Sequence, residues 1–241
     1  MNWFGHYKKQ NKVVGIVGGL GPETTSKFYL DLIDKSRKFC KSYPRVIIDS
    51  ISFPFSLEEE IIFKSKNEYK ILPALKDSIR RLNQARVDFI VIPCNTLHIF
   101  LKELEKDSSV PILDIVQETL KFIKNIGYKK IGLLATGKTV DSKLYEIPLD
   151  ANNIETILPT KNEQLKISKA IVKILKNNIG RTEKEELNSI IRHLAKRNAE
   201  AILLDCTDLQ LVLKQNKFKI PLIDSMEIIE KSTFKRLFIE G

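Results

Sequence analysis

The chain has 241 residues, of which 43% are hydrophobic and 29% are charged, and its formal net charge is +10. This length fits one large globular domain or two of roughly 120 residues. No apolar stretch reaches the ~18 residues needed to cross a bilayer, and residues 1–19 lack the apolar core of a secretory signal. Three cysteines without regular spacing exclude a disulfide scaffold. We therefore expect a cytoplasmic protein with reduced thiols and no membrane partner.

The positive charge is spread along the chain. Lysine and arginine alternate with glutamate on expected helix faces, as in RTEKEELNSIIRHLAKRNAE at 181–200. Nucleic-acid-binding proteins gather basic residues in one patch or stripe. We therefore expect a solvated basic surface and no nucleic-acid partner.

Apolar runs alternate with helix-like patterns along the chain. Strands are predicted at 13–19, 45–52, 88–94, 110–115 and 129–136, and helices at 23–39, 70–85, 96–106 and 116–127. Strands that alternate with amphipathic helices predict an α/β fold with mostly parallel sheets.

The second half of the chain repeats the pattern of the first. A strand glycine precedes a strand-ending cysteine by 79 residues in one half (15 to 94) and by 74 in the other (132 to 206). Each cysteine is followed by Leu at +3 and +7 and by Lys at +8. This internal repeat predicts two pseudo-symmetric Rossmann-like lobes with the active site in the cleft between them. We expect the first lobe to comprise 1–113 plus 218–241, and the second 114–217.

Cys94 and Cys206 each end a buried strand, just before a helix pattern. Ligands of parallel α/β sheets bind at the carboxyl ends of strands, so the repeat predicts two thiols that face each other across the cleft. A helix N-terminus also lowers the pKa of a thiol. Such a pair is suited to removing a proton from one face of a carbon and delivering a proton to the other. Cys40 has no such context, and we interpret it as a small buried hydrophobe.

Several motifs together resemble the aspartate/glutamate racemase family, over about residues 13–232: VGIVGGLGPETT (14–25), PCNTLH (93–98), CTDL (206–209), PILDI and PLIDS. The resemblance implies a PLP-independent amino-acid racemase that uses no cofactor and no metal, takes an amino acid as its small-molecule substrate and is commonly a homodimer. It implies that Cys94 and Cys206 are the catalytic acid–base pair. The residues that it places at the substrate are Gly19, Leu20, Asn95, Thr96, Thr136, Thr139, Thr207 and Asp208.

The sequence departs from the aspartate-specific members of that family. Those members carry an arginine in the loop after the second strand, where this chain reads SISFPFSLEEE (50–60), and a lysine where this chain has Leu165. A second substrate carboxylate would then be buried without a cationic partner, which is costly. With Asp208 in CTDL, the pattern resembles the broad-specificity branch. We expect a substrate not restricted to aspartate, and Glu58, Glu59 or Glu60 is available to a cationic side chain.

Three alternatives remain open. They are an aspartate racemase proper, a related two-cysteine isomerase of unsaturated diacids, and a non-catalytic small-molecule binding protein with the same fold. Asp205 stands where relatives often have glycine, and we expect it to raise the pKa of Cys206 if it points into the site. His98 follows Cys94 by one helical turn, and we expect it to support the site from the core.

Overall fold

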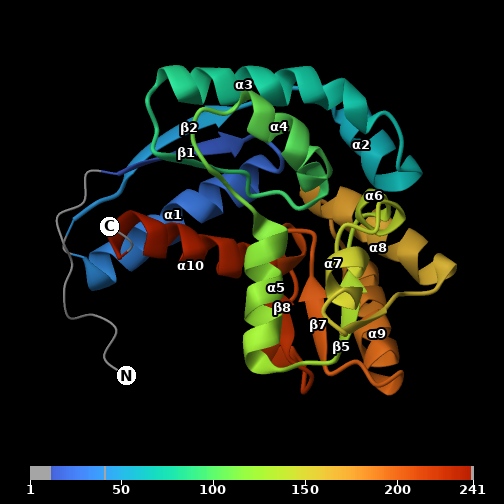
Figure 1. The fold of residues 1–241 in the computed structure, drawn as a ribbon. Coiled ribbons are helices and arrows are strands. Elements are labelled where there is room, and N and C mark those ends of the chain that lie inside the picture. Colours follow the sequence, from blue (N-terminus) through green and yellow to red (C-terminus); the bar gives the residue numbers. More distant parts are fainter. Residues whose placement is uncertain (1–11, 41, 240–241) are drawn as a thin grey trace.

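The structure is a computed structural model that describes residues 12–40 and 42–239, which form two α/β lobes (Figure 1). Each lobe has a 4-stranded sheet, ordered β2-β1-β3-β4 in the first and β6-β5-β7-β8 in the second, and every strand pair is parallel. The strands are β1 (Val13–Gly18), β2 (Arg45–Ser50), β3 (Phe89–Val91), β4 (Ile112–Leu113), β5 (Lys130–Leu134), β6 (Glu155–Ile157), β7 (Ala201–Leu204) and β8 (Leu222–Asp224). The matching strand order confirms the predicted fold with two similar lobes.

The repeat also holds in the strand register. Gly15 of β1 pairs with Ile90 of β3, and Gly132 of β5 pairs with Ile202 of β7. Each isoleucine stands four positions before the cysteine of its own lobe. Both cysteines therefore leave equivalent strands at the carboxyl edge of their sheets.

Helices cover both faces of each sheet. The first sheet has α3 and α4 on one face and α1 and α10 on the other, whereas α8 and α9 pack on the second sheet (Figure 1). The helices are α1 (Pro22–Phe39), α2 (Phe55–Lys64), α3 (Leu72–Gln84), α4 (Leu101–Asp107), α5 (Ile115–Ile126), α6 (Gly137–Asp141), α7 (Glu146–Asp150), α8 (Lys161–Leu175), α9 (Arg181–Lys196) and α10 (Ser225–Phe238). Among the described residues, no helix is both long and apolar enough to cross a membrane.

The PILDI and PLIDS motifs are helix starts. The Asp114 carboxylate accepts hydrogen bonds from the backbone N–H groups of Val116 and Gln117 at the start of α5. Asp224 does the same for the first turn of α10. An aspartate at this position satisfies N–H groups that have no partner within the helix. The repeated motif therefore fixes where the helix after the fourth strand of each lobe begins.

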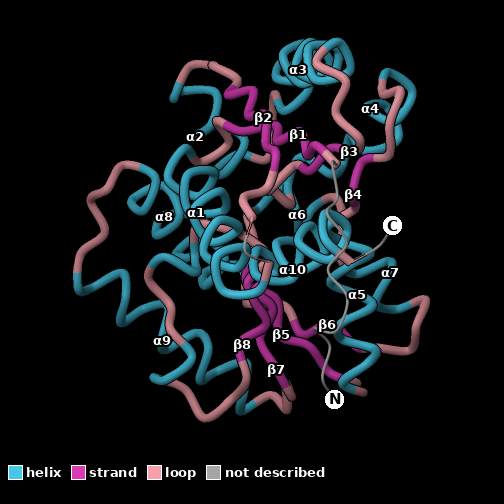
Figure 2. The backbone as a smooth tube through the Cα atoms, turned by 90° about the vertical axis from the view of Figure 1, so that its left-hand side faces the viewer, coloured by secondary structure: helices cyan, strands magenta, loops and turns pink. Residues whose placement is uncertain are grey.

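One apolar core runs through both lobes. It joins Val14 of β1 and Phe28 of α1 in the first lobe to Leu133 of β5 and Leu203 of β7 in the second, with Phe234 of α10 in the same cluster. The tube view shows α1 and α10 lying between the two sheets (Figure 2). Because this core is continuous, neither lobe buries its inner sheet face alone.

The predicted lobe boundary at 218 needs a correction. The strand Leu222–Asp224 pairs with β7, so it belongs to the sheet of the second lobe and not to the first. The chain then enters α10, which contacts both α1 and α5. The repeat explains the error, because β8 is the counterpart of β4 and must complete the second sheet in the same way.

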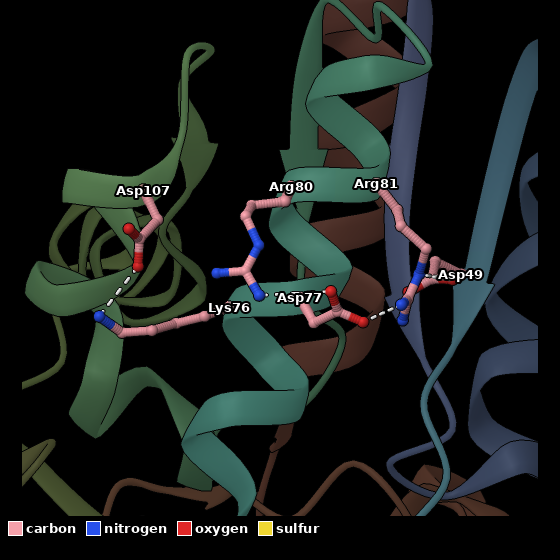
Figure 3. A network of polar contacts seen from close by, with 6 residues as sticks. All are labelled: Asp49, Lys76, Asp77, Arg80, Arg81 and Asp107. Carbon is pink, nitrogen blue, oxygen red and sulfur yellow. Dashed lines mark hydrogen bonds and ion pairs between the residues drawn. The ribbon is translucent and has the colours of Figure 1, made fainter.

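Charged side chains on the outer surface of α3 pair with acids of neighbouring elements (Figure 3). Lys76 lies 2.9 Å from the Asp107 carboxylate at the end of α4, and Arg81 places two nitrogens 2.9 Å from the two oxygens of Asp49 on β2. Asp77 pairs with Arg80 and with Arg81. The basic residues on this face are thus interspersed with acids, as the sequence pattern predicts.

Candidate active site

Cys94 and Cys206 line one cavity between the lobes. Both follow a strand end, Cys94 after β3 and Cys206 after β7. The cavity is lined by Leu20, Phe53, Glu58, Ile61, Ile62, Ile71, Cys94, Asn95, Thr96, Leu97, Thr136, Ile171, Leu175, Asp205, Cys206, Thr207 and Asp208.

The expectation of a lowered thiol pKa does not hold for the empty cavity, where the net shift of both cysteines is upward. Burial raises the pKa of Cys94 to about 12, and the charges of Asp208, Asp205 and Glu58 add to the effect. Burial, then Asp208, raises the pKa of Cys206 well above its ordinary value. Short 3-10 turns, Thr96–Phe100 and Leu209–Leu211, follow the two cysteines, and α4 begins only at Leu101. The backbone N–H groups of Leu97 and Asp208 lower the thiol pKa, but burial outweighs them.

Asp208 connects the Cys206 thiol to the first lobe. The thiol donates to Asp208 Oδ2 at 3.7 Å, and the buried Thr24 hydroxyl on α1 donates a short hydrogen bond to Oδ1. Burial raises the pKa of Asp208 to about 6. Gly21, at φ 82°, lies so close that a Cβ there would be 2.8 Å from Oδ1. Sequence reasoning missed Thr24, although its place in the GGLGPETT motif was a usable signal.

The Asn95 side chain is buried at the cavity wall, and its hydrogen bonds go to protein groups of the second lobe. Its Nδ2 donates to the Asp205 carbonyl and, at 2.9 Å, to Ser225 Oγ, while its Oδ1 accepts a 2.6 Å bond from the Tyr145 hydroxyl. Both amide hydrogens are thus engaged without substrate. Asn95 holds the cysteine loop against the second lobe in this state, a role that the resemblance alone did not indicate.

Three buried threonine hydroxyls meet across the cleft. Thr96 Oγ1 lies 3.0 Å from Thr136 Oγ1 and 3.2 Å from Thr139 Oγ1, and the last two are 3.1 Å apart. Thr136 also accepts the Thr139 backbone N–H as the N-cap of α6. Thr96 and Thr136 line the cavity, whereas Thr139 stands behind them. The triad therefore presents two hydroxyls to a ligand and keeps the third as support.

The other predicted site residues divide into two groups. Leu20 and Thr207 line the cavity. Gly19 does not, because it packs on the end of β2, where a Cβ would lie 2.2 Å from the Ile51 carbonyl oxygen. This close approach at φ 86° explains why glycine occupies the position.

His98 supports the Cys94 loop from the core, as expected. Its Nε2 accepts from the Ile115 backbone N–H at 3.4 Å, so Nδ1 carries the hydrogen that is donated to the Cys94 carbonyl at 2.9 Å. Burial lowers the pKa of His98, which keeps the ring neutral. Both ring nitrogens are engaged with backbone groups and neither faces the substrate space.

Asp205 and Glu58 are the two remaining acids at the cavity. Burial raises the pKa of Asp205 to about 8, and the Thr139 hydroxyl, already engaged by its own neighbours, offsets little of this. Burial, then the charge of Asp208, raises the pKa of Glu58 to about 7. Among the described residues, no lysine or arginine lines this cavity. The site is therefore rich in acids and has no fixed cation.

Residues 17–232 match the family model of the Asp/Glu/hydantoin racemases. The chain belongs to that family. It is 32% identical over 226 residues to the broad specificity amino-acid racemase RacX of Bacillus subtilis, a match that covers 92% of this chain and 96% of the relative. This racemase also resembles the aspartate racemase of Picrophilus torridus (27% identity, TM-score 0.78, 94% of each chain). A second similar structure is an aspartate racemase homologue from Pyrococcus horikoshii (26% identity, TM-score 0.76, 94% of this chain and 99% of the other).

Within the described part of the chain, this family member lacks the cationic contacts expected of an aspartate-specific site. Leu165 is 60% exposed, and Lys166, one residue on, pairs with Glu186 at 3.1 Å. Neither lines the cavity, so a shift of one residue does not bring Lys166 to the substrate. Of the three loop glutamates, Glu58 reaches the cavity, whereas Glu59 pairs with Lys176 and Glu60 with Asn67.

Proposed function

We propose that this racemase interconverts L- and D-amino acids by two-base proton transfer between Cys94 and Cys206. The observation that carries the proposal is that the two thiols reach one cavity from equivalent positions of the two lobes. Opposed approach from two pseudo-symmetric halves is the arrangement that inversion at a carbon requires. One thiolate removes the α-proton from one face while the other thiol supplies its proton to the opposite face.

The reaction needs one thiolate in a site whose empty form holds both thiols protonated. Backbone N–H groups of Leu97 and Asp208 favour the charged forms of Cys94 and Cys206, respectively. The substrate α-ammonium group adds a positive charge next to them, which lowers the thiol pKa further. The thiol proton has an acceptor nearby in Asp208, since Cys206 already donates to its carboxylate.

Negative charge moves onto the substrate carboxylate when the α-proton leaves. The hydroxyls of Thr96, Thr136 and Thr207 line the cavity and supply hydrogen-bond donors to that charge. After inversion the first cysteine carries the α-proton and the second cysteine is the thiolate. A proton must then return from the first sulfur to the second before the next turnover in the same direction. This return balances the protons over one full cycle.

We propose a substrate without a second carboxylate. The cavity has no lysine or arginine among the described residues to pair with such a group. A buried, unpaired carboxylate is unfavourable. The broad specificity named for the Bacillus subtilis relative is consistent with this. The lack of a lysine or arginine at the described cavity wall also disfavours the diacid isomerase, because the substrate of that enzyme carries two carboxylates.

Proton exchange tests the proposal. The reduced enzyme is incubated in deuterated buffer with single L-amino acids, and loss of the α-proton NMR signal is followed. Wild type should exchange and racemise one or more of them. Cys94→Ser and Cys206→Ser should lose racemisation, while Cys40→Ser, which alters a thiol outside the cavity, should keep it. Absence of exchange with every amino acid would favour the non-catalytic binding protein, and exchange with aspartate alone would favour the aspartate racemase.

We further propose a cytoplasmic homodimer. A reducing compartment keeps both thiols free for catalysis. The edge strand β2 and the neighbouring α1 expose Ile48, Tyr29 and Leu30, an apolar surface that a second copy would bury. Light scattering on the purified protein tests the dimer, and Leu30→Glu should shift it toward monomer.

A further inference from the structure

Glu58 stands where the inner cavity meets an outer groove. It lines the cavity that holds Cys94 and Cys206, and it also lines a neighbouring groove between α2 and α8. Ile62 and Leu175 line both spaces as well. A substrate side chain that extends from the thiols toward the outer groove must therefore pass the Glu58 carboxylate.

The groove continues the acidic character of the cavity. Glu23, Glu58 and Glu59 line it, and Lys176 is the one basic residue on its wall within the described part of the chain. Lys176 is already paired with Glu59. The entrance is therefore negative, although the protein as a whole carries a formal charge of +10. Such a local field draws in cations and disfavours acidic ligands.

Glu58 differs from the glutamates beside it on α2. Glu59 pairs with Lys176, and Glu60 accepts from Asn67 Nδ2 at 2.8 Å. No hydrogen bond or ion pair reaches the Glu58 carboxylate from residues 12–40 and 42–239. A half-buried carboxylate without a partner is unfavourable unless a ligand brings one.

A second acid in the cavity also lacks a partner. Asp205 is fully buried, and neither of its carboxyl oxygens has a hydrogen-bond partner among the described residues. Together with Asp208 and Glu58 it gives the cavity three carboxyl groups and no cation from the described part of the chain. Asp205 keeps its proton at neutral pH, so the negative charge that a cationic substrate would balance is that of Asp208 and Glu58.

We propose that the enzyme acts on amino acids with a cationic side chain, and that Glu58 binds the side-chain ammonium or guanidinium group. The α-carbon then lies between the thiols, and the aliphatic part of the side chain lies along Ile62 and Leu175. Glu58 is in this view the residue that determines specificity. The inference rests on the proposed racemase function and narrows its substrate class.

Matched substrates test the role of the charge. Lysine is compared with norleucine and arginine with citrulline, because each pair differs mainly in the charge at the end of the side chain. The rate of α-proton exchange is measured for wild type, Glu58→Gln and Glu60→Gln. Glu60→Gln alters a glutamate on the same helix that lines neither space, so it serves as the control.

Wild type should have a kcat/KM for lysine about tenfold or more above that for norleucine, since a charge-assisted contact is lost with the ammonium group. Glu58→Gln should remove most of this preference, chiefly through a higher KM, because the contact is present in both ground and transition states. Glu60→Gln should leave it unchanged. Glu58→Lys should shift the preference from lysine toward glutamate.

Two results would overturn the inference while the racemase function stands. In the first, wild type exchanges norleucine as fast as lysine. In the second, Glu58→Gln lowers kcat/KM for lysine and for norleucine by the same factor. If Glu58→Gln does not fold, the comparison of lysine with norleucine and of arginine with citrulline in wild type decides whether the enzyme prefers a cationic side chain. Absence of exchange with every amino acid would overturn this inference and the proposed function together.

Discussion

The Tyr145 hydroxyl donates a 2.6 Å hydrogen bond to Asn95 Oδ1, and both side chains are buried. The bond joins the second lobe to the loop that follows Cys94. Because Nδ2 of the same amide is held by Asp205 and Ser225, the Asn95 side chain has a single orientation. Tyr145 therefore positions the loop that carries the first thiol without touching the cavity.

Tyr145→Phe should destabilise the protein by about 1–3 kcal/mol, because Asn95 Oδ1 would be left buried without its donor. The racemisation rate should fall as well, since the Cys94 loop loses its anchor. Chemical denaturation and the exchange assay measure the two effects. Tyr69→Phe removes a hydroxyl from a ring that is 61% exposed and should change neither. Equal stability of both variants would show that the buried bond contributes nothing.

The pH dependence of kcat/KM reports the thiols of the free enzyme. The base must be a thiolate, and burial raises the pKa of both cysteines, to about 12 for Cys94. The thiolate fraction therefore grows as the pH rises, and log kcat/KM should climb from about pH 7 to about pH 8.5 with a slope approaching one. The second thiol stays protonated over this range and produces no falling limb. A flat profile would mean that one thiol is already ionised at neutral pH.

Asp205 makes the stability of the fold depend on pH. Its pKa is raised from 3.8 to about 8 in the folded protein, so between these values the folded state keeps its proton while the unfolded chain releases it. Stability must then fall as the pH rises through this window, by up to about 1.4 kcal/mol per pH unit from this group.

Asp205→Asn removes that contribution, so the free energies of unfolding of the variant and the wild type should diverge steadily between about pH 5 and about pH 7. Both proteins retain the other acids with raised pKa, so the difference isolates Asp205. Parallel curves, measured by urea denaturation at each pH, would contradict burial of this carboxyl group.

Two glycines in the left-handed region form a matched pair for testing the packing of the β1 loop. Gly127, at φ 91°, has open space where a Cβ would stand, so Gly127→Ala should cost about 1–2 kcal/mol of backbone strain. At Gly19, with φ 86°, a Cβ would lie 2.2 Å from the Ile51 carbonyl oxygen, so Gly19→Ala should cost about 3–5 kcal/mol. Thermal denaturation compares the two. Equal losses would mean that the loop shifts freely.

The repeat made the architecture predictable, because two strands that end in cysteine, each at a fixed distance from a strand glycine, imply two equivalent sheets. The same repeat matches PILDI with PLIDS and so places Leu222–Asp224 in the second sheet, but the predicted lobe boundary at 218 did not follow it. Sequence periodicity reports strand and helix faces, whereas sheet membership depends on long-range pairing.

The site was less predictable than the fold. The two cysteines and Thr96, Thr136, Thr207 and Asp208 carry motif signals. The effect of Asp205 on the pKa of Cys206 was predicted from its place beside the cysteine. The rise in the pKa of Cys94 could not be read from the sequence, because it depends on burial and on three carboxyl groups from distant parts of the chain. Tyr145 likewise has no neighbouring motif and reaches Asn95 only through the fold.

The placement of α10 between the sheets links the order of synthesis to folding. The helix is made after β8, yet it covers the inner face of the first sheet beside α1. A nascent chain that already contains β1 to β4 therefore still lacks one of the two helices that cover this apolar face. Until α10 arrives, this surface is a target for chaperones and a risk for aggregation. The first half of the chain must wait for the second before either can close around the thiols.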